Sequence, residues 1–336
     1  MRFDSSVTSV SWIPSESVSG VYQAGFAVGA SHSDIPPPDV IKDLAELDAL
    51  HATARFRFAN RLAAWIEVEN GRIVDAGYSG HGYISPTRFG WGPHREVTFQ
   101  PTPFPEIRTE PHIRATGARF SQTTGGRTGA PMPRPVSGKP HVQWLAPTVW
   151  TTLALTIGTD GSGHGEMTGA SAFPRHWIYD GRGQLVAKSG LADFREWMAT
   201  AHGQHSPWGE EDSQPLVTLA ESALERQLSA TIMRGGARPA IRKLASGSLL
   251  TEQGQPGSEI YLLLDGVLSV WVDGAEVGEL GPGAILGERA LLEEGRRTAT
   301  LRAVTDCVVA AAAQDQIDRA SLASLAEMHH REDADS

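Results

Sequence analysis

The chain is short of cysteine, of long apolar runs and of leader-like sequence. Among its 336 residues there is one cysteine, Cys307, which excludes an internal disulfide and is expected to pack as a small hydrophobe on a strand. No apolar run reaches the roughly 20 residues that a membrane-spanning helix needs. Residues 1–6 lack the apolar core of a signal peptide. These absences predict a cytoplasmic protein without a membrane partner.

Positive charge is also scarce. The chain has 29 lysines and arginines against 39 aspartates and glutamates, which gives a net charge of −10. Proteins that bind nucleic acid usually present a basic surface, so we expect no nucleic-acid partner. The 40% of hydrophobic residues can form a sizeable core, and the length favours two domains.

Residues 1–201 predict a β-rich α+β domain of no recognisable family. Asn70-Gly71 predicts a tight hairpin between strands at 54–68 and 71–78, because both turn residues tolerate positive φ. A helix is predicted at 40–50, with Asp39 as its N-cap. Further strands are predicted at residues 7–13, 21–28, 149–157 and 173–179, a turn at 180–183 and a helix at 191–201.

The stretch from Thr123 to Pro135 has the composition of a loop, because glycine, proline and threonine dominate it. Two glycines beside Arg127 could form a nest of backbone N–H groups that binds an anion. An ordinary surface loop is the favoured interpretation, since the segment lacks the ending of a P-loop.

Metal-binding and catalytic patterns are weak. His202 and His205 lie near three acidic residues, but their spacing matches no zinc signature. The stretches 163–166 and 31–34 place histidine beside a carboxylate without forming a triad or a nucleophile elbow. We therefore predict no metal, no cofactor and no catalytic residues, and an enzyme remains only as an alternative.

Residues 202–214 are polar and rich in turn formers, which predicts a linker. Within residues 215–235, an amphipathic pattern from Leu216 to Met233 predicts a helix. The apolar stripe of that helix consists of Leu216, Ala220, Ala223, Leu224, Leu228 and Ile232.

Residues 236–320 predict short strands at close intervals. Asp265-Gly266 and Asp273-Gly274 have the composition of type I′ hairpin turns. The strands are predicted at residues 260–264, 267–272, 275–280, 298–304 and 307–312. A helix is predicted at 316–328, so residues 321–336 hold the end of that helix and an acidic tail.

One motif interrupts these strands: Gly287-Glu288-Arg289-Ala290-Leu291-Leu292, followed after a spacer by Arg297-Thr298-Ala299-Thr300. Backbone N–H groups at the start of a helix bind phosphate oxygens. An arginine fork adds charge-assisted contacts to the same phosphate, and a carboxylate accepts from a sugar hydroxyl. The motif, which we call the cassette (residues 287–300), therefore suits a small anion that carries a sugar.

The cassette resembles the phosphate-binding cassette of the cyclic nucleotide-binding domain family, found in catabolite activator proteins, kinase regulatory subunits and cyclic-nucleotide-gated channels. The family pattern is G-E-x-A-L-L, a short spacer and R-[ATS]-A-T. The family usually has an apolar residue at the position of Arg289. The resemblance implies a mainly β fold (α+β), with a C-terminal β-roll flanked by helices. It also implies that the nucleotide-binding residues are Gly287, Glu288, Arg289, Ala290, Arg297 and Thr298.

The resemblance implies a role for each of these residues. Arg297 would bind the cyclic phosphate, and Glu288 the ribose 2′-hydroxyl. Backbone donors would come from Gly287, Arg289 and Ala290. Thr298 would lie near the phosphate and the base; a threonine there resembles cGMP-binding members and does not exclude cAMP.

The sequence thus predicts a regulatory protein that senses cAMP or cGMP. Ligand binding would shift residues 216–233 and the C-terminal helix, and so modulate the N-terminal domain, a protein partner or a second copy of the chain. No helix-turn-helix follows the β-roll, which excludes the usual layout of a catabolite-activator transcription factor.

Two alternatives stay open from the sequence. In the first, Glu288 and Arg297 pair with each other, and the β-roll is a ligand-free interaction module. In the second, an enzyme active site lies within residues 1–201 and the β-roll gates it.

Overall fold

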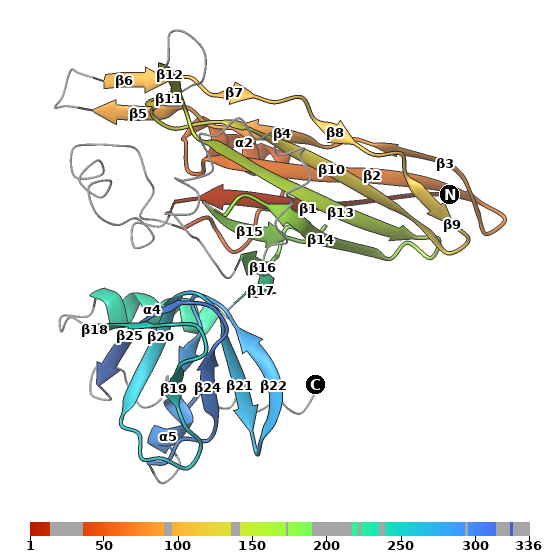
Figure 1. Cartoon of the computed structure of the whole chain (residues 1–336). Helices are drawn as coiled ribbons and strands as arrows, with labels where there is room; N and C mark the ends of the chain where they lie inside the picture. Colours follow the sequence, from red (N-terminus) through yellow and green to blue (C-terminus); the bar gives the residue numbers. More distant parts are fainter. Residues whose placement is uncertain are drawn as a thin grey trace. The chain divides into compact units, whose positions relative to one another are not determined.

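Strands form most of the structure and gather in two separate units (Figure 1). This computed structural model confirms the mainly β fold. The N-terminal unit comprises residues 1–187 and 192–215, and the C-terminal unit comprises 188–191 and 216–336. The structure describes residues 1–13, 36–90, 96–135, 142–172, 174–189, 217–220, 223–234, 239–292, 295–313 and 323–324.

Several predicted features lie outside the described residues. These are the strand at 21–28, the histidine-containing stretch at 31–34, the helix at 191–201, the linker at 202–214 and most of the C-terminal segment that follows residue 313.

Six strands of the N-terminal unit belong to its first sheet. They are β1 (Arg2–Trp12), β2 (Phe58–Glu69), β3 (Arg72–Tyr78), β4 (His81–Ile84), β15 (Arg175–Tyr179) and β16 (Leu185–Ser189). Their order is β16-β15-β1-β2-β3, and β4 also pairs with β2. The Asn70-Gly71 hairpin between β2 and β3 is present, with φ of 49° and 74° at the two turn residues.

The second sheet is formed by β7 (Thr102–Pro103), β8 (Ile107–Arg108), β9 (His112–Arg114), β10 (Gly117–Arg127), β13 (Thr148–Gly158) and β14 (Gly163–Ala170). Its order is β14-β13-β10-β7, and β8 and β9 also pair with β10. Two separate ribbons consist of β5 (Thr87–Gly90) with β6 (Glu96–Phe99), and of β11 (Met132–Pro135) with β12 (Val142–Leu145).

Buried polar side chains join the two larger sheets. The Asn60 amide of β2 donates to the carbonyls of Gln122 and Thr151 at 3.3 and 3.0 Å, and the Gln122 amide returns a 2.9 Å bond to Asn60 Oδ1. Ser9 of β1 and Thr151 of β13 share a 2.9 Å hydroxyl contact. A buried amide is tolerated only when its hydrogen bonds are made. The network therefore fixes which residues of the two sheets face each other.

The opposite face of the first sheet is covered by helix α2 (Leu44–Ala52). Val10, Trp12 and Leu47 belong to the core between this helix and the sheet. The helix begins at Asp43, whose side chain accepts from the Glu46 N–H, while the Glu46 carboxylate accepts from the backbone N–H of residue 42. This resembles a capping box, except that Glu46 bonds the N–H of the residue before the N-cap.

The prediction that the helix begins at residue 40, with Asp39 as its cap, is wrong. Ile41 donates its backbone N–H to the Gly183 carbonyl at 2.9 Å, so this part of the chain is held to the 180–183 turn instead of entering the helix.

The loop predicted at 123–135 is also wrong at both of its ends, since residues 132–135 form β11. Residues 123–127 lie in β10 and pair with β13 along their whole length. A Cβ at Gly125 would overlap the Trp150 side chain and the Val149 carbonyl, so glycine is required there by close packing and not by a turn. Arg127 donates to the Ala146 carbonyl at 2.8 Å. The anion-binding nest does not exist.

The C-terminal unit contains two four-stranded sheets. Its strands are β17 (Val217–Leu219), β18 (Ala240–Leu244), β19 (Leu249–Thr251), β20 (Glu259–Asp265), β21 (Leu268–Val272), β22 (Ala275–Leu280), β23 (Ile285–Leu286), β24 (Thr300–Ala303) and β25 (Cys307–Ala313). Two helices of this unit are α4 (Ala223–Arg234) and the short α5 (Glu288–Leu292). The sheet orders are β18-β25-β20-β23 and β19-β24-β21-β22.

Two predictions are corrected in this unit. Asp265-Gly266 does not form a hairpin, because β20 and β21 belong to different sheets and the dipeptide carries the chain from one sheet to the other. By contrast, Asp273-Gly274 does join paired strands, with φ of 50° and 82°. The helix predicted from Leu216 begins only at Ala223, since residues 217–219 form β17.

Cys307 is buried in the core of the C-terminal unit, as predicted. Its Sγ donates to the Val267 carbonyl at 3.3 Å, and burial raises the pKa of the thiol. Both effects keep this cysteine a neutral packing residue.

His176 of β15 is buried and neutral. Its Nε2 lies 2.8 Å from the Ser171 carbonyl and must carry the proton, so Nδ1 accepts from the Ser11 hydroxyl at 2.6 Å. Burial lowers the pKa of His176 to about 4. Ser11 and His176 are both buried, which separates this serine–histidine pair from any substrate.

We expect acid to destabilise the N-terminal unit through His176. Between pH 6.5 and 4 the unfolded chain takes up a proton that the folded chain refuses, so stability falls as the pH falls through this window. The loss between pH 7.5 and 5 should be about 2 kcal/mol. Urea unfolding followed by tryptophan fluorescence measures it. His176→Gln should remove this part of the pH dependence, and His164→Gln, at an exposed position, should retain it. Equal pH dependence in both variants would contradict the assignment.

Candidate functional site

The first half of the cassette follows β23 without a break. Gly287 has φ of +87°, which turns the chain sharply into α5. Glu288 is only 4% exposed and Ala290 is fully buried. The first turn of this short helix is therefore packed against the core of the unit.

The second half of the cassette brings Arg297 to the same place. Its side chain is 7% exposed. Nη1 donates to the Glu259 carbonyl at 2.9 Å and to the Gly287 carbonyl at 3.5 Å. Nη2 lies 3.5 Å from the Tyr261 hydroxyl, and the guanidinium carbon lies 5.1 Å from the centre of the Tyr261 ring. The guanidinium is therefore held by carbonyl dipoles and an aromatic face.

Two glycines leave room for this side chain. A Cβ at Gly257 or at Gly287 would overlap the Arg297 side chain. The backbone is fixed as well, because Arg297 N–H donates to the Gln255 carbonyl and Gly254 N–H donates to the Arg297 carbonyl, both at 2.8 Å. The turn at 254–257 thus sets the position of the arginine.

Tyr261 links Arg297 to a surface ion pair. The Tyr261 hydroxyl donates to Glu259 Oε2 at 3.0 Å, and Glu259 pairs with Arg242. Burial and this hydrogen bond raise the pKa of Tyr261, while Arg297 and Arg242 act in the opposite direction. Sequence reasoning missed Tyr261 as a site residue, although it lies in the run of residues that precedes Asp265-Gly266 on β20.

Comparison with known proteins assigns this unit to a family. Residues 241–323 match the family model described as "Cyclic nucleotide-binding domain". These residues belong to the cyclic nucleotide-binding domain family. The predicted resemblance is therefore confirmed for the C-terminal unit, and the N-terminal unit remains without a recognised family.

The curated relatives share only this domain with the chain. The cGMP-dependent protein kinase egl-4 of Caenorhabditis briggsae is 34% identical over 61 residues, which is 18% of this chain and 8% of the kinase. The cAMP-dependent protein kinase regulatory subunit of Yarrowia lipolytica is 35% identical over 68 residues, which is 20% of this chain and 18% of the subunit. The chain thus spans less than a fifth of the length of either relative.

The similarity of the chain to solved structures is low overall. The Thermus thermophilus Catabolite Activator Protein is 28% identical, with a TM-score of 0.27, over 33% of this chain and 56% of that chain.

The structure brings the predicted nucleotide-binding residues of this domain into one region. Gly287 and Arg297 are in direct contact through the Gly287 carbonyl, and α5 begins with Glu288. Arg289 and Thr298 are half-buried. Among the described residues, Arg297 forms no ion pair with Glu288, so the pairing that a ligand-free module would use is not observed.

Helix α4 packs on the nucleotide-binding domain beside the cassette. Its Leu228 and Ile232 enter the core that contains Ile285 of β23. Glu225 is buried and its carboxylate accepts from the Ile285 N–H at 3.2 Å. The helix therefore contacts the strand that leads directly into Gly287.

The other candidate sites of the sequence have structural explanations or lie outside the described residues. Glu166 forms a 2.6 Å ion pair with Arg119, and the whole 163–166 stretch lies in β14. Over the part of the chain that the structure describes, no cluster of three histidine, cysteine or acidic side chains suits a metal ion. His202 and His205 are not among these residues.

The described helices also bear on the membrane prediction. Within the described ranges, none combines the length and the apolar character that crossing a bilayer requires.

We expect Gly287→Ala to destabilise the nucleotide-binding domain more than Gly254→Ala. Both glycines have positive φ, but the space beside Gly254 is open, whereas a Cβ at Gly287 would displace Arg297. Backbone strain alone should cost about 1 kcal/mol, and overpacking at Gly287 should add about 2 kcal/mol. Urea unfolding with amide hydrogen exchange of residues 241–292 as the readout measures both. Equal losses would show that Gly287 is not needed to seat Arg297.

Proposed function

We propose that the C-terminal unit is a sensor of cAMP or cGMP, and that the phosphate of the nucleotide binds Arg297. The observation that carries this proposal is the buried guanidinium of Arg297, which has no carboxylate partner among the described residues. A buried charge without a counter-charge is costly. A phosphate would supply that charge through a bidentate, charge-assisted contact.

The rest of the cassette supports the same ligand. The positive φ of Gly287 turns the first N–H groups of α5 outward from β23, where they can meet the remaining phosphate oxygens. Glu288 follows immediately and offers a carboxylate for a ribose hydroxyl. Relatives named for cGMP and for cAMP dependence both match this domain, so the two nucleotides are tested side by side.

We further propose that nucleotide binding is reported by α4. A ligand shifts a conformational equilibrium only through its different affinity for the two states. The Glu225–Ile285 hydrogen bond and the apolar contacts of Leu228 join α4 to β23 at Ile285, two residues before the cassette begins. A movement of Gly287 on nucleotide binding therefore changes how α4 packs against β23. The output of that change is a partner surface, the N-terminal unit or a second copy of the chain.

Calorimetry with cAMP and cGMP on the full chain tests the binding site. We expect at least one nucleotide to bind the wild type, and Arg297→Ala to weaken it about 100-fold, because a charge-assisted contact to a buried group contributes about 3 kcal/mol. Arg297→Lys keeps the positive charge but loses the planar fork of the guanidinium. Its nucleotide affinity should lie between those of the wild type and Arg297→Ala.

Arg296→Ala is the matched control, because Arg296 is exposed and donates only to the Gly254 carbonyl. Its affinity should stay within about twofold of the wild type. Absence of heat from either nucleotide with the wild type would refute the sensor. Undiminished binding by Arg297→Ala would refute the assigned site.

Hydrogen exchange of α4 tests the coupling. Saturating nucleotide should change the exchange rates of the α4 amides several-fold in the wild type, and much less in Glu225→Ala, which loses the acceptor for Ile285. Glu279→Ala, at an exposed position of β22, should respond like the wild type. Unchanged α4 exchange in saturated wild type would rule out this route.

A further inference from the structure

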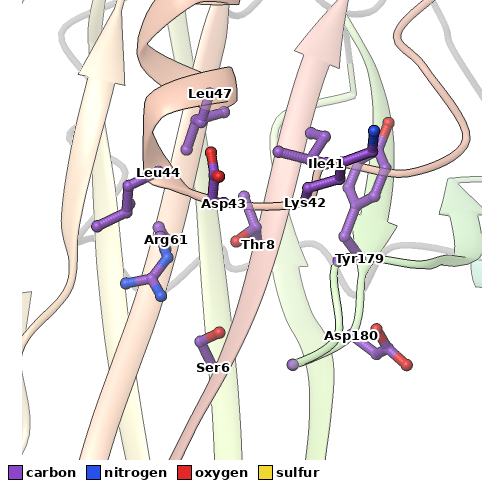
Figure 2. A pocket seen from close by; sticks show the side chains of 12 residues that line it. Ser6, Thr8, Ile41, Lys42, Asp43, Leu44, Leu47, Arg61, Tyr179 and Asp180 are labelled. Carbon is purple, nitrogen blue, oxygen red and sulfur yellow. The ribbon is translucent and has the colours of Figure 1, made fainter.

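The N-terminal unit contains a cavity of about 70 Å³ that no assigned function uses (Figure 2). It lies where β1 and β2 meet the start of α2 and the 180–183 turn. One water needs roughly 10–15 Å³ measured in this way, so the cavity has room for a small molecule of a few non-hydrogen atoms.

The pairing of the strands shows which polar side chains lie together at the cavity. Thr8 of β1 lies directly opposite Arg61 of β2, and on its other side opposite Tyr179 of β15. Directly opposed residues in antiparallel strands point to the same face of a sheet. Because side chains alternate along β1, Ser6 shares the face of Thr8. In Figure 2 the side chains of Ser6, Thr8 and Arg61 lie together beneath the start of α2.

Two of these groups have no hydrogen-bond partner within the described residues. The Thr8 side chain is 8% exposed, and its hydroxyl has no hydrogen-bond partner within the described residues. Arg61 is half-buried, and among the same residues it donates no hydrogen bond and forms no ion pair. Burial lowers the pKa of Arg61, and the nearby Tyr83 acts against that shift. A hydroxyl and a guanidinium of this kind form a receptor for an oxyanion.

The carboxylates at the cavity limit which anion fits. Asp43 uses Oδ1 to cap α2 through the Glu46 N–H at 2.9 Å, and its second oxygen can accept from a ligand. Asp180 Oδ1 accepts from the backbone N–H groups of Arg182 and Gln184, both at 2.9 Å, and so holds the turn that forms one wall. The lining carries Lys42 and Arg61 against Asp43 and Asp180, so its positive and negative side chains balance and it offers no excess positive charge for a doubly charged anion.

We propose that this cavity binds a short carboxylic acid that carries a hydroxyl or an ammonium group. The ligand carboxylate accepts from the Arg61 fork and from the Thr8 and Ser6 hydroxyls. The hydroxyl or ammonium group of the ligand donates to Asp43. The site is independent of the nucleotide-binding domain, and its occupation would stabilise the junction of α2 with the sheet.

Calorimetry on the full chain tests the proposal with glycolate, glycine, acetate and inorganic phosphate at constant ionic strength. We expect saturable binding of glycolate or glycine, and the stronger of the two identifies the donor group. Acetate should bind at least fivefold more weakly, because it has no group that donates to Asp43. Equal affinity for acetate would overturn the role of Asp43.

Three variants assign the contacts. Arg61→Gln should weaken binding at least tenfold, and Arg61→Lys, which preserves the charge and the fold, should weaken it severalfold through loss of the fork. Thr8→Val has nearly the same volume and should weaken binding severalfold. Arg72→Gln, at an exposed position of β3, should bind like the wild type. Failure of all four probes to saturate, binding of phosphate alone, or unchanged affinity in Arg61→Lys and Thr8→Val together would overturn the proposal.

Discussion

The buried guanidinium of Arg297 is the constraint on which the C-terminal unit depends. A charge at this depth needs a complete set of acceptors, and the structure supplies the Glu259 and Gly287 carbonyls together with the face of Tyr261. These acceptors come from β20 and from the start of the cassette, so the arginine ties one sheet to the cassette. Gly257 and Gly287 are glycine because any side chain there would occupy the space of the guanidinium.

The same contacts explain how a local event at the cassette reaches further. Gly287 touches Arg297 on one side and continues β23 on the other, and β23 is packed against α4. Under the proposed function, a phosphate that binds the Arg297 fork would compete with the carbonyls that now hold it. The residues that adjust are then those of the cassette and of β23. The path from the cassette to α4 is short. Coupling along it would need only a change in the Glu225–Ile285 hydrogen bond and in the contact of Leu228 with the same core.

In the N-terminal unit, buried polar side chains act together with the apolar core to fix how the two larger sheets face each other. Asn60 and Gln122 satisfy each other and three backbone carbonyls across the two sheets. A slip of either strand would leave both amides buried and unsatisfied, which costs several kcal/mol. This network selects one register. The same register places Thr8 beside Arg61 on the opposite face, where the cavity forms.

The sequence by itself determined the cassette as a motif, because its residue types and their spacing lie within one short segment, whereas the position of Arg297 is set by the turn at 254–257 and by β20. It also determined the Asn70-Gly71 and Asp273-Gly274 hairpins, whose turn residues act locally. Only the tertiary structure decided that Asp265-Gly266 connects two sheets and that Gly125 lies within a paired strand. The physical reason is that a dipeptide fixes its own φ and ψ, whereas strand partners and the space for a Cβ are fixed by residues distant in the chain.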